Sequence, residues 1–318
     1  MRRRPLLLVL RALGLGDFLT ALPALRALAE AFPDHRRLLA APLALEPLAC
    51  LIGVVEGVID VPRLAPIALA QPPDVAVNLH GRGPQSHRAL LSTRPRGLIA
   101  FAHPEIASTR SAPRWTADEH EVQRWCRLLA EHGIAADPTR LDLPPPSVPV
   151  PPGAMGATLL HPGAAAEARR WPSARWTALA RAEATAGRRV LVTAGVGELD
   201  LARSITRQAG LDDSVVCSGA DLVQLAALVG TVARVVVGDT GVAHLATALG
   251  TPSVVLFGPT SPDLWGPPPD RRRHRVLWAG ISGDPHAATV APGLLAISVD
   301  DVREALAGLE DDLARAAA

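Results

Sequence analysis

The chain of 318 residues is longer than one small core requires, and its length is typical of about two domains. Hydrophobic residues make up 48% and charged residues 20%, so a large core can be buried, and a formal net charge of +1 excludes a broad basic field for nucleic acid. The 32 basic residues are all arginine, so an anion site has to use arginine, histidine and backbone amides.

The cysteines and the N-terminus bear on the compartment. Cys50, Cys126 and Cys217 are far apart and odd in number, which is typical of a reducing compartment and argues against a disulfide framework or a zinc site. The basic start and the apolar run that follows it imitate a secretory leader, but Arg11 and Asp17 interrupt the run and no cleavage site follows. We expect a cytoplasmic protein with at most peripheral contact with the inner face of the membrane.

The first half alternates short apolar runs with helical patterns. Leu6–Leu10 ends in a glycine turn, Gly14–Gly16, and a long helical pattern follows until Phe32–Asp34 stops it. Pro23 fits this pattern because the first turn of a helix tolerates proline. Further strands are predicted at 38–41, 58–61, 75–79 and 98–101, and an amphipathic helix at 117–132.

A proline-rich segment, residues 143–153, separates the two halves. Six prolines in eleven residues cannot continue a helix or a central strand, so the segment is predicted to be a semi-rigid linker. It divides a first domain, residues 1–142, from a second domain, residues 154–298.

Strand and helix patterns alternate again in the second half. Strands are predicted at 158–161, 190–193, 214–217, 235–237 and 253–257, and helices at 173–186, 198–209, 221–229 and 242–249, with Ser173 and Asp221 as N-caps. This alternation predicts an α/β fold with parallel sheets, whose ligands bind at the carboxyl ends of the strands. The last segment, 299–318, is predicted to be a helix that packs back on the first domain.

The segment Val237–His244 carries the sharpest chemical pattern. A buried strand ends, the chain turns at Asp239, and a helix begins at Thr240 and Gly241. Amides at a helix start form an anion site, Gly241 allows a phosphate to come close, and His244 lies one turn later. Alone, this pattern is equally that of a plain helix cap at Asp239 or Thr240.

Two neighbouring strand ends strengthen the case for an anion site. The loops that follow the strands at 158–161 and 253–257 contain His161, Gly163, Ala164, Arg169 and Arg170, and the segment Phe257–Pro262. Because parallel strands end at one edge of a sheet, the three loops are expected on the same rim.

These segments resemble a known family. Leu225–Pro262 is similar to the signature of glycosyltransferase family 9, the ADP-heptose:lipopolysaccharide heptosyltransferase family; Arg169–Pro172 with Trp176 resembles its basic–Trp–Pro–Trp segment, and Leu8–Pro33 its N-terminal signature. The matches cover nearly the whole chain in the right order. The resemblance implies the GT-B fold, two Rossmann-like domains with parallel sheets facing a central cleft.

The resemblance also implies an inverting, metal-independent transfer of a sugar, most simply heptose from ADP-heptose, to a hydroxyl of a glycan, glycolipid or small molecule. Asp17 matches the family's general base, which takes the proton from the acceptor hydroxyl. Helix capping after the glycine turn is the alternative role for Asp17.

The donor-binding residues implied by the resemblance follow strand ends of the second half. They are His161, Gly163, Ala164, Arg169, Arg170, Glu198, Asp239, Thr240, Gly241 and His244. Arg169 stands where the family usually has a phosphate-binding lysine, and whether Arg169 or Arg170 contacts phosphate stays open. Glu198 resembles a glutamate that binds ribose, with a favourable acid in the first turn of a helix as the alternative.

Acceptor-side residues are expected in the first half: Gly16, His80, Arg82 and His120, with His87 nearby in the sequence. A lone histidine often has only a structural hydrogen-bonding role, which is the alternative for each of the three. Trp171 and Trp176 are predicted to be core residues.

No cofactor, metal or nucleic-acid partner is expected, and the protein is predicted to be a monomer. The third glycine of a Gly-x-Gly-x-x-Gly motif would fall at Leu19, which argues against a dehydrogenase. A nucleotide-sugar epimerase of the same fold and a non-catalytic nucleotide-sugar-binding protein remain the alternatives.

Overall fold

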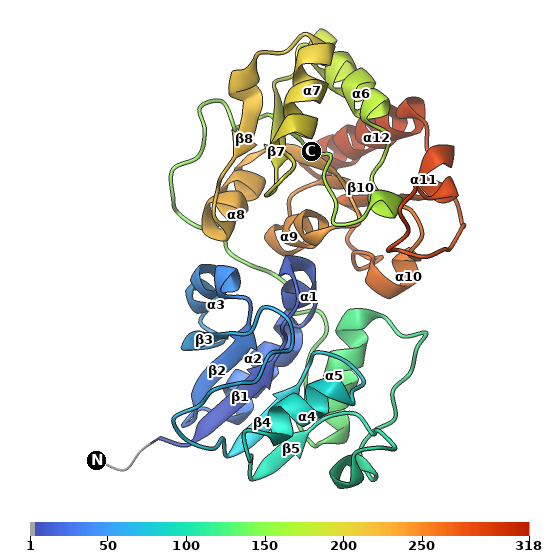
Figure 1. Cartoon of the computed structure of the whole chain (residues 1–318). Coiled ribbons are helices and arrows are strands. Elements are labelled where there is room, and N and C mark those ends of the chain that lie inside the picture. Colours follow the sequence, from blue (N-terminus) through green and yellow to red (C-terminus); the bar gives the residue numbers. More distant parts are fainter. Residues whose placement is uncertain (1–3, 318) are drawn as a thin grey trace. The chain divides into compact units, whose positions relative to one another are not determined.

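The computed structural model describes residues 4–317, and the chain divides into two compact units, Met1–Leu141 and Asp142–Ala318 (Figure 1). The division falls within two residues of the boundary that the proline-rich segment predicts. The basic residues Arg2 and Arg3, which begin the leader-like pattern, lie outside the described residues. No helix within residues 4–317 is long and apolar enough to cross a membrane.

The first unit contains a five-stranded parallel sheet in the order β3-β2-β1-β4-β5. Its strands are β1 (Leu6–Leu10), β2 (Arg36–Ala41), β3 (Gly57–Asp60), β4 (Val75–Asn78) and β5 (Gly97–Ile99). Its helices are α1 (Leu15–Thr20), α2 (Leu22–Ala31), α3 (Glu46–Ile52), α4 (Gln85–Leu91) and α5 (Glu121–Glu131). All five residues of β1 are buried, as expected of a central strand between two helical layers.

The long helix predicted after β1 is in fact two helices. Ala21 ends α1 and is also the N-cap of α2. Pro23 lies in the first turn of α2, where its missing N–H needs no partner, whereas in one continuous helix it would leave a carbonyl without its bond. The predicted helix at 117–132 begins later than expected, at Glu121, because His120 is its cap.

The second unit contains a six-stranded parallel sheet in the order β11-β10-β9-β6-β7-β8. Its strands are β6 (Thr158–His161), β7 (Val190–Ala194), β8 (Val216–Ser218), β9 (Arg234–Gly238), β10 (Ser253–Phe257) and β11 (His274–Trp278). Its helices are α6 (Ser173–Thr185), α7 (Leu199–Ala209), α8 (Leu222–Thr231), α9 (Gly241–Leu249), α10 (Pro262–Trp265), α11 (Pro292–Ala296) and α12 (Val299–Ala317). Short 3₁₀ turns occur at Leu43–Leu45, Ala107–Thr109, Glu167–Arg169 and Asp213–Val215.

Both predicted N-caps can be checked. Asp221 caps α8 with a full capping box, in which its side chain accepts from Gln224 N and the Gln224 side chain accepts from Asp221 N. The prediction for Ser173 is wrong, because Ser173 is the first residue of α6 and Pro172 is the N-cap.

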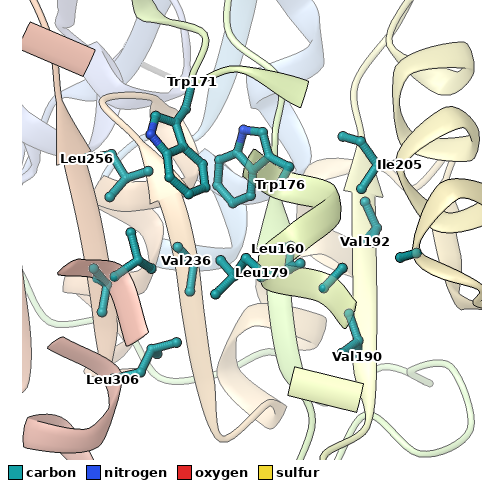
Figure 2. Packing of buried hydrophobic residues seen from close by; sticks show 14 of the residues in the cluster. Leu160, Trp171, Trp176, Leu179, Val190, Val192, Ile205, Val236, Leu256 and Leu306 are labelled. Atoms are coloured by element: carbon teal, nitrogen blue, oxygen red, sulfur yellow. The ribbon is translucent and has the colours of Figure 1, made fainter. Parts of the chain in front are cut away.

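The core of the second unit confirms that Trp171 and Trp176 are packing residues (Figure 2). Both are almost fully buried, and their rings meet edge to face with centroids 5.1 Å apart. Trp171 Nε1 donates to the carbonyl of Ile297 at 2.9 Å, which satisfies the indole and joins the segment before α6 to the segment before α12.

Helix α12 packs on α6, β10 and β11 of the second unit, and Leu306 and Leu309 are buried in the same core as the two tryptophans. These contacts belong to the second unit, and packing of α12 on the first domain stays a prediction. Its apolar stripe covers one face of the sheet of its own unit, which would otherwise be exposed to water.

Candidate functional site

The strand order of the second unit brings the predicted donor loops together. Strands β10, β9, β6 and β7 are neighbours and parallel, so the segments after them leave the same edge of the sheet. Those segments begin at Pro162, Gly195, Asp239 and Gly258. Each of these segments contains residues suited to phosphate binding, and all of them lie at the carboxyl edge of the sheet, which we call the rim.

The turn between β9 and α9 forms the centre of this rim. Thr240 is the N-cap of α9 and Gly241 is its first residue, so the start of the helix dipole lies where the sequence predicts it. Thr240 Oγ1 is buried and has no hydrogen-bond partner among the described atoms. Asp239 is 8% exposed, and the ring of His244 packs edge to face on Trp265 with centroids 6.0 Å apart.

Arg169 and Arg170 have different surroundings, which separates two residues that the sequence leaves equivalent. Arg169 Nη1 donates to the carbonyl oxygen of Asp239 at 3.3 Å, and its Nε is buried without a partner among the described atoms. Arg170 Nε donates to the carbonyl of Ala164 at 2.9 Å, and its Nη atoms lie 3.4 Å from Glu167 and 3.9 Å from Glu198. Only Arg169 therefore reaches the start of α9 with donor capacity left over.

Glu198 lies at the next loop of the rim. It is the N-cap of α7, and its Oε2 accepts from the backbone N–H of Gly195 at 2.9 Å. Gly163 lies directly against this carboxylate, and a Cβ at position 163 would overlap it. Close packing of a backbone and an acid is the physical reason for glycine at this position.

His161 is the last residue of β6. Its Nδ1 lies 2.9 Å from Thr193 Oγ1 on β7. Burial lowers the pKa of His161, and the nearby Glu198 carboxylate opposes that effect. The contact with Thr193 fixes the orientation of the neutral imidazole at the rim. The last predicted residue, Ala164, is buried, and its backbone carbonyl accepts from Arg170.

Asp17 lies in the first turn of α1, at the carboxyl end of β1 in the first unit. Gly14 is the N-cap of this helix, so Asp17 is not its cap. The Asp17 side chain is 29% exposed, and its Oδ1 lies 3.5 Å from Arg11 Nη2. Burial raises the pKa of Asp17; Arg11 acts to lower it and Glu121 to raise it.

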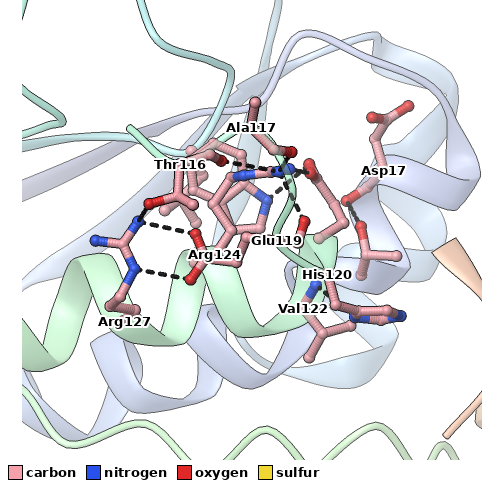
Figure 3. A network of polar contacts seen from close by, with 12 residues as sticks. Asp17, Thr116, Ala117, Glu119, His120, Val122, Arg124 and Arg127 are labelled. Atoms are coloured by element: carbon pink, nitrogen blue, oxygen red, sulfur yellow. Dashed lines mark hydrogen bonds and ion pairs between the residues drawn. The ribbon is translucent and has the colours of Figure 1, made fainter. Parts of the chain in front are cut away.

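Two residues that sequence reasoning missed, Arg11 and Glu121, form a buried ion pair beside Asp17. Arg11 Nη2 lies 2.9 Å from Glu121 Oε1, and the arginine side chain is fully buried. Arg124 Nη1 pairs with the other oxygen of Glu121. Arg124 Nη2 donates to the carbonyls of Thr116, Ala117 and Glu119 (Figure 3). The sequence clue to Arg11 was a charge directly after an apolar strand; Glu121 carries no comparable clue.

The predicted acceptor-side residues have diverse roles. His80 N donates to Asn78 Oδ1 at 3.0 Å, and burial, assisted by Arg11, lowers the pKa of His80 to about 4. His120 caps α5 by accepting from Val122 N, and Arg82 is exposed. Gly16 lies in α1 next to Asp17.

His87 has the structural role that was the alternative for it. It is fully buried, and its Nε2 lies 2.7 Å from the carbonyl of Phe101. Its Nδ1 lies 3.1 Å from Asn78 Nδ2, so both ring nitrogens are occupied.

Acidic pairs elsewhere serve as caps. Asp212 accepts from Ser214 N at 2.8 Å, and Asp301 accepts from Ser298 N at 2.7 Å. Within residues 4–317 no group of three or more His, Cys, Asp and Glu side chains has the arrangement of a metal site.

Comparison with known proteins gives a family match over more than half of the chain. The family model described as glycosyltransferase family 9 (heptosyltransferase) matches residues 106–287. The chain is also 34% identical over 115 residues to lipopolysaccharide heptosyltransferase 1 of Pseudomonas aeruginosa. That match spans 36% of this chain and 32% of the relative, about a third of its length.

Solved structures are similar over nearly the whole chain. The ADP-heptose lipopolysaccharide heptosyltransferase II of Escherichia coli has a TM-score of 0.73 and 21% identity, with 96% of this chain and 98% of that chain covered. The E. coli heptosyltransferase WaaC with ADP has a TM-score of 0.72 and 20% identity, with 95% and 99% covered. These similarities confirm the predicted α/β GT-B fold class.

Proposed function

The chain belongs to glycosyltransferase family 9, and on that premise we propose that it transfers a sugar from a nucleotide-sugar donor to an acceptor hydroxyl. The observation that carries the proposal is the rim of the second unit. A helix start, an arginine with unused donors and a nearby carboxylate gather after neighbouring strands, which is the chemistry that a nucleoside diphosphate and its ribose require.

We assign the diphosphate to the start of α9 and to Arg169. The helix supplies amides and part of a positive charge, and Arg169 supplies a full charge. Thr240 Oγ1 and Arg169 Nε are buried polar atoms without a partner among the described residues, and a bound phosphate would satisfy them. Glu198 faces the ribose hydroxyls in this assignment, and Asp239 faces the sugar.

The reaction we propose inverts the anomeric centre. The acceptor oxygen attacks the anomeric carbon, its proton passes to Asp17, and the bond from that carbon to the phosphate oxygen breaks with its electron pair going to the leaving nucleoside diphosphate. The raised pKa of Asp17 and its partial exposure suit a base that must meet an acceptor from solvent.

We propose that this transfer needs no metal ion and no cofactor. The charge that develops on the leaving diphosphate has to be stabilised by preorganised groups, and Arg169 with the amides of α9 supplies both a cation and dipoles. These groups belong to the protein itself, so the stabilisation is present before the donor arrives.

We propose ADP-heptose as the donor, because the structurally similar heptosyltransferase II of E. coli is described by that sugar nucleotide. The acceptor is proposed to be a hydroxyl of a glycan, a glycolipid or a small molecule. A glycolipid acceptor would bring a monomeric, cytoplasmic protein to the inner face of the membrane, which co-sedimentation with acceptor-bearing vesicles would test.

The direct test is a panel of nucleotide sugars, screened first by thermal stabilisation and then by product formation with glycan and small-molecule acceptors. Stabilisation follows RT ln(1 + [L]/Kd), so a donor at about 100 times its Kd adds about 2.7 kcal/mol. Transfer by the wild type and its loss in Asp17→Ala would support the proposal. Binding without turnover in both proteins would favour the non-catalytic alternative, and a changed sugar on the nucleotide would favour an epimerase.

A further inference from the structure

We propose that Glu121 is a positioning residue that keeps Asp17 basic by engaging the charge of Arg11. The inference rests on the proposed role of Asp17 as general base. It is carried by the geometry of one buried arginine shared unequally between two carboxylates.

Arg11 is fully buried and uses its donors on several acceptors. Its Nη2 lies 2.9 Å from Glu121 Oε1 but 3.5 Å from Asp17 Oδ1, so the close ion pair goes to Glu121. Its Nε donates to the backbone carbonyl of Asp17 at 2.7 Å, and its Nη1 donates to the carbonyl of Leu79. Arg11 thus fixes the main chain of Asp17 while directing its charge elsewhere.

Glu121 can hold this charge because its own position is fixed. Trp125 Nε1 donates to Oε1 at 2.9 Å, and Arg124 pairs with Oε2. The side chain is 6% exposed, so its geometry is set by these partners and not by water. A carboxylate with two arginines and an indole has no freedom to release Arg11.

Asp17 is the less engaged carboxylate of the two. A contact of 3.5 Å is at the limit of a hydrogen bond, and the side chain keeps 29% of its surface exposed. A carboxylate in a tight arginine pair is a weak base, because the pair favours its charged form. The unequal sharing leaves Asp17 able to accept a proton.

Other ionisable groups around Asp17 come from the neighbouring elements. His80 follows β4 and is kept neutral by burial and by Arg11, and His120 caps the helix that carries Glu121. The charges that act on the pKa of Asp17 are Arg11, which lowers it, and Glu121, which raises it.

The first test is Glu121→Gln, which keeps the shape and an acceptor but removes the charge. Arg11 then has Asp17 as its nearest anion, which lowers the pKa of Asp17. The acidic limb of the pH profile of kcat/KM should therefore shift to lower pH by about one unit. The plateau rate should fall a few-fold because the base is weaker. Glu131→Gln on the same helix is the matched control, since Glu131 pairs with Arg127 and has no part in the Arg11 pair.

The second test, Arg124→Gln, has the opposite sign. Without Arg124 the negative charge of Glu121 is less balanced and repels the Asp17 carboxylate more, which raises the pKa of Asp17. The acidic limb should therefore shift to higher pH by about one unit. Arg124→Lys keeps the charge and should leave the limb near its wild-type position. A loss of packing alone would move Glu121→Gln and Arg124→Gln in the same direction.

The carboxyl ¹³C titration of Asp17, assigned by comparison with Asp17→Asn, reports the same pKa without any substrate. Opposite shifts in the two variants would support the inference even if no sugar transfer is found, in which case only the proposed function fails. An unmoved Asp17 titration in folded Glu121→Gln, or shifts of one sign in both variants, would overturn it. If Glu121→Gln does not fold, the direction of the Arg124→Gln shift decides.

Discussion

Arg169 Nη1 lies 3.3 Å from the carbonyl oxygen of Asp239 and so joins the segment after β6 to the turn before α9. Arg170, its neighbour in sequence, is held instead by the carbonyl of Ala164 and faces Glu167 and Glu198. Consecutive arginines therefore have separate tasks, and substitution of each can tell them apart.

We expect Arg169→Ala to weaken nucleoside-diphosphate binding by about 2 kcal/mol, roughly 30-fold, because a charge-assisted hydrogen bond to phosphate is lost. Arg170→Ala should cost less, and the double variant a few kcal/mol in total. Calorimetric titration with the nucleoside and the nucleoside diphosphate measures both. Equal losses for the two ligands would mean that the phosphate lies elsewhere.

Gly163→Ala should weaken donor binding about tenfold, which is about 1.4 kcal/mol, with little loss of stability. The new Cβ would overlap the Glu198 carboxylate, which can swing away but then loses its bond from Gly195 N. The matched control is Gly308→Ala in α12, where a Cβ meets no described heavy atom within 4 Å. That control should stabilise the protein by about 0.5–1 kcal/mol and leave affinity unchanged.

Asp17→Asn should lower the transfer rate by about 10²–10⁴-fold, the usual contribution of a general base. Donor affinity should stay within about twofold, since the proposed donor residues all belong to the second unit. Single-turnover kinetics and calorimetry separate the two effects, with the exposed Asp34→Asn as control. Near-normal turnover of Asp17→Asn would remove Asp17 from the mechanism.

We expect the protein to lose stability in mild acid because of the buried His274. Burial, with Arg271 and Arg273 nearby, lowers its pKa to about 4, while Ser253 Oγ holds its Nδ1 at 2.9 Å. The unfolded chain takes up the proton near pH 6.5, so the stabilisation is present above that pH and is lost as pH falls toward 4.

For His274 alone the loss between pH 8 and pH 5 is about 2 kcal/mol. Denaturant melts of the wild type and His274→Gln at both pH values measure it, with exposed His286→Gln as the control. An identical pH dependence of the wild type and His274→Gln would contradict the assignment.

Chelation should leave transfer unaffected. The acid pairs that could suggest a metal site, at Asp212 and Asp301, instead cap backbone N–H groups of Ser214 and Ser298. We expect equal initial rates with EDTA, magnesium and manganese. Activity that EDTA abolishes and either ion restores would count decisively against a metal-independent reaction.

Much of the fold could be predicted from local sequence patterns. Apolar runs such as Leu6–Leu10 and Val235–Val237 are buried on both faces, and that burial is what a parallel central strand requires. The turn at Asp239–Gly241 could be predicted for the same reason, because an acid, a small hydroxyl and a glycine are the local requirements of a strand that turns into a helix.

Elements at the edge of a sheet or in its outer layer were harder to predict. Strand β11 was missed because it is a partly covered edge strand that begins with His274 and Arg275, so its apolar run is only three residues long, Val276–Trp278. The packing of α12 on the sheet of its own unit was not predicted, because an apolar stripe indicates that a helix must be covered and does not indicate which sheet covers it.

By itself the sequence determined the two α/β units, most strand and helix positions, the family, and the residues at each strand end, since all of these follow from local pattern. Only the tertiary structure decided that Arg169 and not Arg170 reaches the α9 turn, and that Glu121 engages Arg11 beside Asp17. Arg11 and Glu121 are 110 positions apart. The sequence shows that an arginine next to a buried strand needs a partner, but it does not show which carboxylate that partner is. The partner is decided when the sheet and α5 pack together and exclude water from Glu121.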